Sequence, residues 1–428
     1  MMNGIFKIDL NVLRRGDKTI WGVVALLLGF ALLGVISTST ISEVKSISSV
    51  FLIFARDVLV GVVAMLAACW LDYRCYRGIT WIALVLSIAG LAWAFLSGTR
   101  WISLFGASLQ PSAFALIAMV MFTARYLEKY NRDPESMLSW RRLIFDLWGP
   151  VLVMAFLITF YNLSTGLIFM FTFYVVLLIG RYPVRHILVT IGAFIVMAGG
   201  LYGLYKAKPE AFEGTRMGTW VARLERFFKK DETLDIADIN KMSPAQREDY
   251  NRRKKEDADK RMQENAARTA IALGGVLPSA GPGKSIQKYF LSEADSDFIF
   301  SILVEEYSFI GGAFILLLFV VLAIRVTIQA FKVEDMFGML VLCGLLCVMM
   351  SQAVVHTGVN VGMIPLTGQN LPFISSGGTS IITSCLMIGI IQKIIMNSQQ
   401  AAEARKTVQP VMREEEKPEE EREDAQTE

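Results

Sequence analysis

The chain has 428 residues, of which 54% are hydrophobic and 19% are charged. A soluble globular domain usually carries about 25% charged residues and 45–50% apolar ones. The formal net charge of +3 says little by itself, because in a membrane protein the distribution of charge between loops carries the information. The composition excludes a soluble enzyme and a nucleic-acid-binding module, so we expect no nucleic-acid partner.

The apolar excess is concentrated in blocks of about 20 residues, the length that crosses a bilayer core of about 30 Å. The sequence therefore predicts an all-α integral membrane protein, a polytopic bundle of about ten transmembrane helices. The first block is too long for a signal peptide and is interpreted as a retained span. The predicted spans are residues 19–37, 50–70, 79–97, 112–128, 143–160, 165–180, 185–205, 298–324, 336–356 and 374–396.

Basic residues are unevenly distributed between the two sets of loops. The short loops that precede even-numbered spans carry Lys45 and Arg100, whereas the loops on the opposite side carry many more. Because Lys and Arg accumulate in cytoplasmic loops, this bias places both termini in the cytoplasm. The basic residues on the predicted cytoplasmic side are Lys7, Arg14, Arg15, Lys18, Arg74, Arg77, Arg125, Lys129, Arg132, Arg141, Arg142, Arg181, Arg185, Arg325 and Lys332.

This orientation divides the chain into five segments. Residues 1–18 form a cytoplasmic N-terminal segment, and residues 19–205 contain spans 1 to 7. Residues 206–297 form one large external loop between spans 7 and 8. Spans 8 to 10 occupy residues 298–398, and residues 399–428 are predicted to be a disordered, acidic cytoplasmic tail.

Three carboxylates, those of Glu293, Asp295 and Asp297, crowd the external entrance of span 8. One interpretation is helix capping, because acidic side chains accept hydrogen bonds from the free N–H groups of a first helical turn. The other is chemical. Asp297 stands directly against Phe298-Ile299-Phe300, where partial desolvation raises the pKa of a carboxyl group toward that of a useful base. From the residues alone, both interpretations stay open.

The glycine-rich stretch upstream of these carboxylates invites comparison with a phosphate-binding loop. The stretch Gly274-Gly-Val-Leu-Pro-Ser-Ala-Gly-Pro-Gly-Lys284-Ser285 fails as a P-loop, because Pro278 stands where the motif needs its first glycine. Two alternatives remain. The glycines form a tight turn, or they present N–H groups and Lys284 to a phosphate on a lipid carrier.

Charged residues also lie inside the predicted spans. Such charges are costly and tend to face a bundle interior or a wet cavity. Arg56 could engage an anionic headgroup in a lipid-accessible cavity, or it could form an internal pair with a nearby acid. Glu305 and Glu306 lie about two turns below Asp297, so one of them can share its helix face.

Four groups of motifs occur in a fixed order along this topology. They are Gly98-Thr-Arg100-Trp101 with Gln110-Pro-Ser112; Gly274-Gly275 through Gly281-x-Gly283; Ser296-Asp-Phe-Ile-Phe300 with Glu305-Glu-x-x-Phe-Ile-Gly311; and Pro365-Leu-Thr-Gly368 with Leu371-Pro-Phe-Ile-Ser375-x-Gly377-Gly-Thr-Ser380. Together they resemble the SEDS family (shape, elongation, division and sporulation) of integral-membrane peptidoglycan glycosyltransferases. The resemblance covers spans 1 to 10, about residues 15–398.

Further motifs bear on the branch of the family. Asn162-Leu-Ser-Thr165, Gly180-Arg181 and Arg216-Met-Gly-Thr-Trp-x-x-Arg223 are more similar to the division branch (FtsW) than to the elongation branch (RodA). Two features depart from the family pattern. Ala113 and Leu116 replace the usual Glu and Lys, which puts a basic substrate contact there in doubt, and residues 229–268 look longer and more charged than the usual linker.

The resemblance implies that the substrate is lipid II, polymerised into glycan strands on the outer face of the cytoplasmic (inner) membrane during septal cell-wall synthesis. Asp297 matches the family's catalytic aspartate. It would act as a general base on the acceptor's 4-hydroxyl in an inverting attack, with undecaprenyl pyrophosphate as leaving group. That charge needs fixed cations or a divalent metal, Mg or Mn. The substrate-binding candidates are Arg56, Arg100, Arg216, Arg223, Lys284, Glu305, Glu306, Ser375 and Gly377.

The resemblance also implies partners, namely a class B penicillin-binding protein, which crosslinks the stem peptides, and other membrane proteins of the division machinery. The main rival hypothesis is a lipid II flippase, which would use the same cavity for transport without chemistry. A transporter needs a wet cationic path but no carboxylate at an outer helix entrance. The elongation-branch polymerase is a second alternative, and a structural scaffold, which needs no intramembrane charge, is a third.

Overall fold

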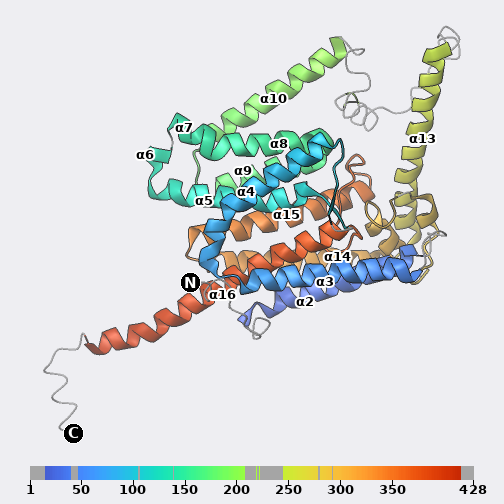
Figure 1. The fold of residues 1–428 in the computed structure, drawn as a ribbon. Helices are drawn as coiled ribbons and strands as arrows, with labels where there is room; N and C mark the ends of the chain where they lie inside the picture. The colour runs from blue at the N-terminus through green and yellow to red at the C-terminus, as the bar shows by residue number, and fades with distance from the viewer. Residues whose placement is uncertain are drawn as a thin grey trace.

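The chain folds into a bundle of long helices (Figure 1). The computed structural model describes residues 15–39, 47–104, 107–137, 139–207, 218, 221, 244–277, 280–291 and 293–415. Its helices are α2 (Lys18–Thr38), α3 (Ile47–Trp70), α4 (Tyr73–Leu96), α5 (Pro111–Arg132), α6 (Pro134–Met137), α7 (Trp140–Leu143), α8 (Gly149–Tyr161), α9 (Leu163–Ile179), α10 (Val184–Ala207), α13 (Pro244–Leu273), α14 (Ile299–Ala330), α15 (Met336–Asn360) and α16 (Gly378–Glu415), with a π-helical turn at Ile144–Trp148 and a 3-10 turn at Gln287–Phe290.

Each predicted apolar block coincides with a helix or, for 143–160, with the run from α7 to α8. Among the described residues, eight helices are long and apolar enough to cross a membrane. The apolar helix α9 is shorter, and charged residues enter the second half of α5. The prediction of an all-α, polytopic membrane protein is therefore confirmed, with α5 and α9 as its two less typical spans.

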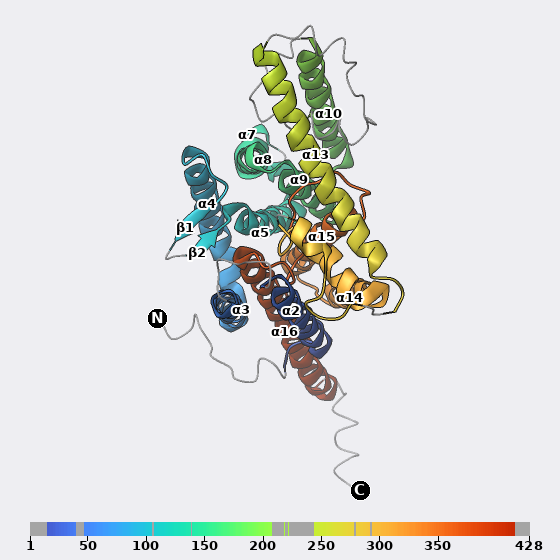
Figure 2. The same ribbon diagram turned by 90° about the vertical axis from the view of Figure 1, so that its right-hand side faces the viewer.

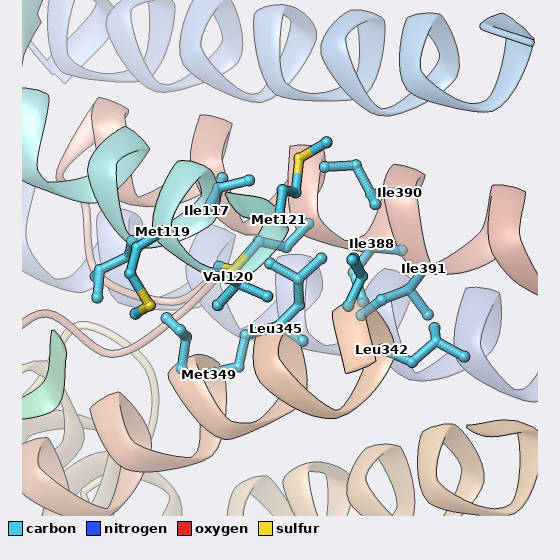
Figure 3. Close-up of a cluster of buried hydrophobic side chains, with 14 of the residues drawn as sticks. Ile117, Met119, Val120, Met121, Leu342, Leu345, Met349, Ile388, Ile390 and Ile391 are labelled. Carbon is cyan, nitrogen blue, oxygen red and sulfur yellow. The ribbon is translucent and has the colours of Figure 1, made fainter. Parts of the chain in front are cut away.

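The apolar core lies where α5, α15 and α16 meet (Figure 3). Side chains such as Val120, Leu345 and Ile388 are completely or almost completely buried there. Gly344 lets α15 approach α5 closely, because a Cβ atom at this position would lie 2.5 Å from a methyl carbon of Val120. Small residues commonly permit such approach between membrane helices, where packing rather than the hydrophobic effect holds the helices together.

Two structured segments lie outside the predicted spans. The α4–α5 connection contains a hairpin, in which β1 (Ile102–Leu104) pairs antiparallel with β2 (Ala107–Leu109). At the other end of the chain, α16 continues past the predicted end of its span to Glu415 and runs out of the bundle (Figure 1). Residues 399–415 of the predicted disordered tail are therefore helical, as their many Ala, Gln, Glu, Lys and Arg residues favour.

Helix α13 stands out from the bundle and touches it at one end (Figures 1 and 2). Its distal part is highly charged, in agreement with the helix-favouring composition of the predicted external loop. At its base, Ala266 and Ala267 are buried against Ala294 and Phe298, which flank Asp297. The base of α13 thus packs directly on the segment that enters α14.

Helix α14 is interrupted at Ser308, whose φ of 69° lies in the left-handed region. A break inside a bundle frees backbone groups that must find other partners. Here the N–H of Phe309 donates to the carbonyl of Gly275 (2.9 Å), and the N–H of Gly281 donates to the carbonyl of Glu306 (3.2 Å). A Cβ atom at Gly274 would lie 2.2 Å from the carbonyl oxygen of Val304. The glycine-rich stretch is therefore a turn that fits against the break in α14.

At the opposite end of the bundle, Asp17 joins three helices. Its carboxylate caps α2 by accepting from Thr19 N and Ile20 N. It also accepts from Arg325 of α14 (Nε, 2.7 Å) and from Gln329 (Nε2, 2.6 Å). Its backbone exchanges two hydrogen bonds with the side chain of Gln392 in α16. Because Asp17 is 4% exposed, removing its carboxylate leaves buried donors without partners.

We expect Asp17→Ala to lower the thermal stability of the detergent-purified protein more than Asp72→Ala does. Asp72 is a matched control, because it caps α4 through Arg74 N alone. Both variants lose a cap, worth about 1 kcal/mol, but Asp17→Ala also strands polar partners at roughly 1–3 kcal/mol. Equal melting temperatures for the two variants would contradict this role of Asp17.

The predicted orientation can be tested with Lys255→Cys in α13 and Ala402→Cys in α16, both at exposed positions. The variants are made in a background whose five native cysteines are replaced. We expect a membrane-impermeant maleimide to label residue 255 in intact cells and residue 402 after permeabilisation, because basic loops place the end of α16 inside. Labelling of both cysteines from the same side would reject the topology.

Candidate active site

The turn that carries Asp297 winds around one backbone carbonyl. The N–H groups of Ser296, Asp297 and Phe298 all donate to the carbonyl of Glu293, at 3.0 to 3.3 Å. The N-cap residue of α14 is Phe298, whose side chain makes no capping hydrogen bond. Among the described residues, the carboxylates of Glu293, Asp295 and Asp297 have no hydrogen bond to the first turn of α14, so the structure lends the capping interpretation no support.

The loop between α15 and α16 holds this turn from the other side. The hydroxyl of Ser375, a predicted site residue, donates to the carbonyl of Ser296 (2.8 Å) and accepts from the N–H of Leu371 (2.8 Å). Its neighbour Ser376 donates through its N–H to the carbonyl of Asp295 and through its hydroxyl to the Asp295 carboxylate (2.6 Å). Ser375 thus contacts the backbone beside Asp297.

The carboxylate of Asp297 remains available. Burial, aided by the negative charge of Glu293, raises the pKa of Asp297 to about 6, although Arg100 and a hydrogen bond from Ser296 act in the opposite direction. Within the described part of the chain, that long bond from the Ser296 hydroxyl (3.5 Å) is the only one the carboxylate accepts. Gly368, with a φ of 65°, faces it, and a Cβ atom there would lie 3.2 Å from Oδ2. The group is a half-buried carboxylate with the properties of a general base.

Arg100 and Arg56, two of the predicted substrate-binding residues, lie at the end of the fold that holds Asp297. Arg100 is exposed in the turn after α4, close enough to lower the pKa of Asp297, and its guanidinium lies 5.4 Å from the Trp101 ring. Arg56 of α3 forms an ion pair with Asp57 (2.7 Å), while 46% of its side chain stays exposed. The buried Asp57 packs against the first residue of α16, since a Cβ atom at Gly378 would lie 2.4 Å from Oδ2.

Glu305 and Glu306 hold the segment that joins α13 to α14 against α14. Glu305 accepts from the hydroxyl of Ser285 and from the N–H of Ile286 (2.9 Å). Glu306 accepts from the hydroxyl of Ser37 in α2 and from the N–H of Ser285 (3.1 Å). Both glutamates are buried, Glu306 completely. Their carboxylates are thus engaged with the loop and α2, rather than with Asp297 on a shared helix face.

The remaining predicted residues have varied positions. Lys284 is exposed in the loop that Glu305 and Glu306 anchor. The carbonyl of Gly377 accepts from Ser380 N (2.7 Å) at the start of α16. Leu116, which replaces a usual Lys, is buried in the apolar core. Arg216 and Arg223 lie outside the described residues.

Motifs far apart in the sequence also meet here. The hydroxyl of Thr379 donates to the carbonyl of Ser108 (3.0 Å) and accepts from the N–H of Gln110 (3.1 Å). Thr165, at the start of α9, donates to the side chain of Gln369 (3.2 Å), next to Gly368. The loop that carries Gly368 is therefore tied to α9, and the start of α16 is tied to the hairpin and to the residue that precedes α5.

The expected divalent cation has no evident ligand set in the part of the chain that the structure describes. No group of three or more His, Cys, Asp or Glu side chains there is arranged to hold a metal ion. Near Asp297, the Asp295 carboxylate is already bound to the Ser376 hydroxyl. The described residues therefore contain no ready-made cluster of protein ligands for Mg or Mn.

Sequence reasoning missed two residues that support this region. Lys288 is 1% exposed, and its ammonium donates to the carbonyls of Ser37 (3.0 Å) and Gly283 (2.7 Å), which ties the segment between α13 and α14 to α2. Asn360, the last residue of α15, donates to the carbonyl of Asp297 (3.0 Å). Asn360 lies just beyond a predicted apolar block, and a buried amide at such a place is a weak signal.

Relatives of known sequence support the family resemblance. The family model for cell cycle proteins that groups FtsW, RodA and SpoVE matches residues 17–228 and 242–400. Stage V sporulation protein E of Bacillus subtilis is 28% identical over 390 residues, which cover 87% of this chain and 94% of that protein. A probable peptidoglycan glycosyltransferase FtsW of Geobacter metallireducens is 28% identical over 418 residues, which cover 92% of this chain and 98% of that protein.

Solved structures share the fold. Rod shape determining protein RodA of Thermus thermophilus has a TM-score of 0.59 at 18% identity, covering 90% of this chain and 97% of that one. A chain of a peptidoglycan synthase complex has a TM-score of 0.62 at 21% identity, covering 90% and 99%. With the family model matched along most of its length, this chain belongs to the FtsW, RodA and SpoVE family of cell cycle proteins.

Proposed function

We propose that this chain is a peptidoglycan glycosyltransferase that polymerises lipid II, with Asp297 as its general base. Family membership supports the activity, as do relatives named probable peptidoglycan glycosyltransferase FtsW that align over 90% or more of the chain. The observation that carries the mechanism is the state of the Asp297 carboxylate. It is half-buried, has a pKa of about 6 and accepts one long hydrogen bond from the described residues around it.

The proposed reaction is a single displacement. The acceptor's 4-hydroxyl oxygen attacks the anomeric carbon of the donor sugar, and its proton passes to Asp297. As the new glycosidic bond forms, the bond between the anomeric carbon and the pyrophosphate oxygen breaks, and undecaprenyl pyrophosphate leaves with the electron pair. The configuration at the anomeric carbon inverts, because one attack occurs on the face opposite the leaving group. Asp297 then returns the proton to solvent.

The leaving pyrophosphate needs positive charge to stabilise it. Arg56, Arg100 and Lys284 are our candidates, because each is exposed at the end of the fold that holds Asp297 or its loop. The pair of Arg56 with Asp57 uses Nε and Nη2. Since a guanidinium has five N–H donors, Arg56 can contact a phosphate without giving up that pair.

We place the chain in the cytoplasmic membrane, with both termini in the cytoplasm and Asp297 at the outer face. We further propose a class B penicillin-binding protein as its partner. Support comes from the structural neighbour in a peptidoglycan synthase complex that coordinates polymerization and crosslinking. The septal role follows the division-type motifs and the relatives named FtsW.

The direct test of the mechanism is Asp297→Asn, assayed with labelled lipid II and the purified complex. Loss of a general base typically costs about 10²–10⁴-fold in rate, and we expect at least that loss of glycan chains. Folding should survive. A pKa raised by burial means that the ionised carboxylate costs stability above pH 6, and Asn removes that cost.

Asp295→Asn is the matched control. Its amide oxygen can still accept from the Ser376 hydroxyl, so we expect a much milder effect. Normal glycan chains from Asp297→Asn would refute the assignment. Translocation of lipid II by the wild-type protein without any glycan product would favour the flippase instead.

The pKa of Asp297 also predicts a pH profile. Because a base must be deprotonated, we expect kcat/KM, which reports the pKa of the free enzyme, to fall about tenfold for each pH unit below about 6. The profile is measured as initial rates of lipid II polymerisation by the wild-type complex and by Asp295→Asn. An acid limb near pH 4 in the wild type would show that Asp297 is not a desolvated base.

A further inference from the structure

Asn360 makes four hydrogen bonds at the entrance of α14. Its amide nitrogen donates to the carbonyl of Asp297 (3.0 Å) and to the carbonyl of His356 (2.9 Å) in its own helix. Its amide oxygen accepts from the N–H of Ser301 (3.1 Å) and from the Ser301 hydroxyl (2.7 Å). The side chain is 0% exposed. The amide therefore links the last turn of α15 to both the turn that carries Asp297 and the first turn of α14.

The neighbours of this amide fix its orientation. The carbonyls of Asp297 and His356 can accept but not donate, so they must face the amide NH₂ group. The N–H of Ser301 can donate but not accept, so it must face the amide oxygen. If the amide were flipped, its oxygen would face the carbonyls of Asp297 and His356, which are also acceptors. The Ser301 N–H would then have no partner. The arrangement uses both donors and both lone pairs of the side chain.

This arrangement explains why the Asp297 carboxylate makes no hydrogen bond to the first turn of α14 among the described residues. The first turn of a helix has N–H groups without intrahelical partners, which a preceding Asp or Ser side chain normally satisfies. In α14 the amide oxygen of Asn360 satisfies one of them, that of Ser301, from another helix. No side chain of the N-cap residue does so. The neighbouring Asp297 carboxylate is consequently not drawn onto the helix end.

We propose that Asn360 is a positioning residue for the transfer reaction, because it caps α14 from α15 and holds the backbone of Asp297 so that the carboxylate faces the acceptor. The proposal rests on the proposed function of Asp297. Asn360 itself touches no substrate in this role. It acts through Asp297, and its loss should therefore lower kcat while leaving the KM for lipid II nearly unchanged.

The test compares Asn360→Ala with Ser301→Ala in steady-state lipid II polymerisation by the purified complex. Displacement of a reacting group by about 1 Å can cost about 10²-fold in rate, so we expect Asn360→Ala to lower kcat by about 10–100-fold. Ser301→Ala loses the hydroxyl contact with the same amide but keeps the backbone N–H contact, and the bond to Asp297 stays. We expect its kcat to remain within about threefold of the wild type.

A double variant separates positioning from general damage to the fold. If Asn360 acts through Asp297, adding Asn360→Ala to Asp297→Asn should barely lower the residual rate further, since residues that act as a unit are not additive. Long incubations with radiolabelled lipid II measure that residual rate. An equal loss in both backgrounds would show a merely structural role and overturn the proposal.

The remaining outcomes are also decisive. Normal kcat in Asn360→Ala, together with an inactive Asp297→Asn, would reject the positioning role but keep the proposed function. Full activity of Asp297→Asn would reject the proposed function itself. If Asn360→Ala does not fold, Asn360→Ser takes its place, because it leaves room for a water molecule at the Ser301 N–H. Failure of both variants to fold, while Ser301→Ala folds, would make Asn360 a folding determinant and reject the proposal.

Discussion

Hydrogen bonds to three successive backbone carbonyls, those of Asp295, Ser296 and Asp297, hold the turn that precedes α14. The donors come from Ser376, Ser375 and Asn360, on two neighbouring segments. If its carboxylates held the turn in place, they would be weaker bases, because hydrogen bonding to an ionised carboxylate lowers its pKa. Backbone anchoring avoids this conflict. The Asp297 carboxylate can be both fixed in place and free to accept a proton.

The surroundings of that turn depend on the break in α14. At Ser308 the helix gives up regular hydrogen bonds, and the glycine-rich loop supplies new partners to the freed groups. Glu305 and Glu306, just before the break, bind the same loop through the backbone and hydroxyl of Ser285. Buried carboxylates are tolerated when hydrogen bonds satisfy them, and here both oxygens of Glu305 but only Oε1 of Glu306 have partners among the described residues. The result is that the segment around Ser285 and Ile286 is fixed to α14.

Apolar block length predicted the helices well, because spanning a bilayer imposes a length that the sequence displays directly. The position of Asp297 against Phe298 left capping and catalysis both open, and the family resemblance selected this residue as the base. The partners of these residues were less predictable, since they come from distant segments. In the sequence, Asn360 lies at the end of an apolar block, and the neighbouring residues give no indication that it caps α14. Helix periodicity predicted that one of Glu305 and Glu306 shares the helix face of Asp297. The contacts of Glu306 with Ser285 and Ser37 depend instead on the fold of the segment between α13 and α14.

The most direct measurement is the structure of the Asp297→Asn variant with lipid II bound, in which the chemistry is stopped before product forms. We expect the acceptor's 4-hydroxyl oxygen to lie within about 3 Å of the residue 297 side chain, the distance of a proton transfer. The donor's pyrophosphate should lie against Arg56, Arg100 or Lys284. An acceptor sugar bound well out of hydrogen-bonding reach of residue 297, with its hydroxyl facing another base, would contradict the role of Asp297.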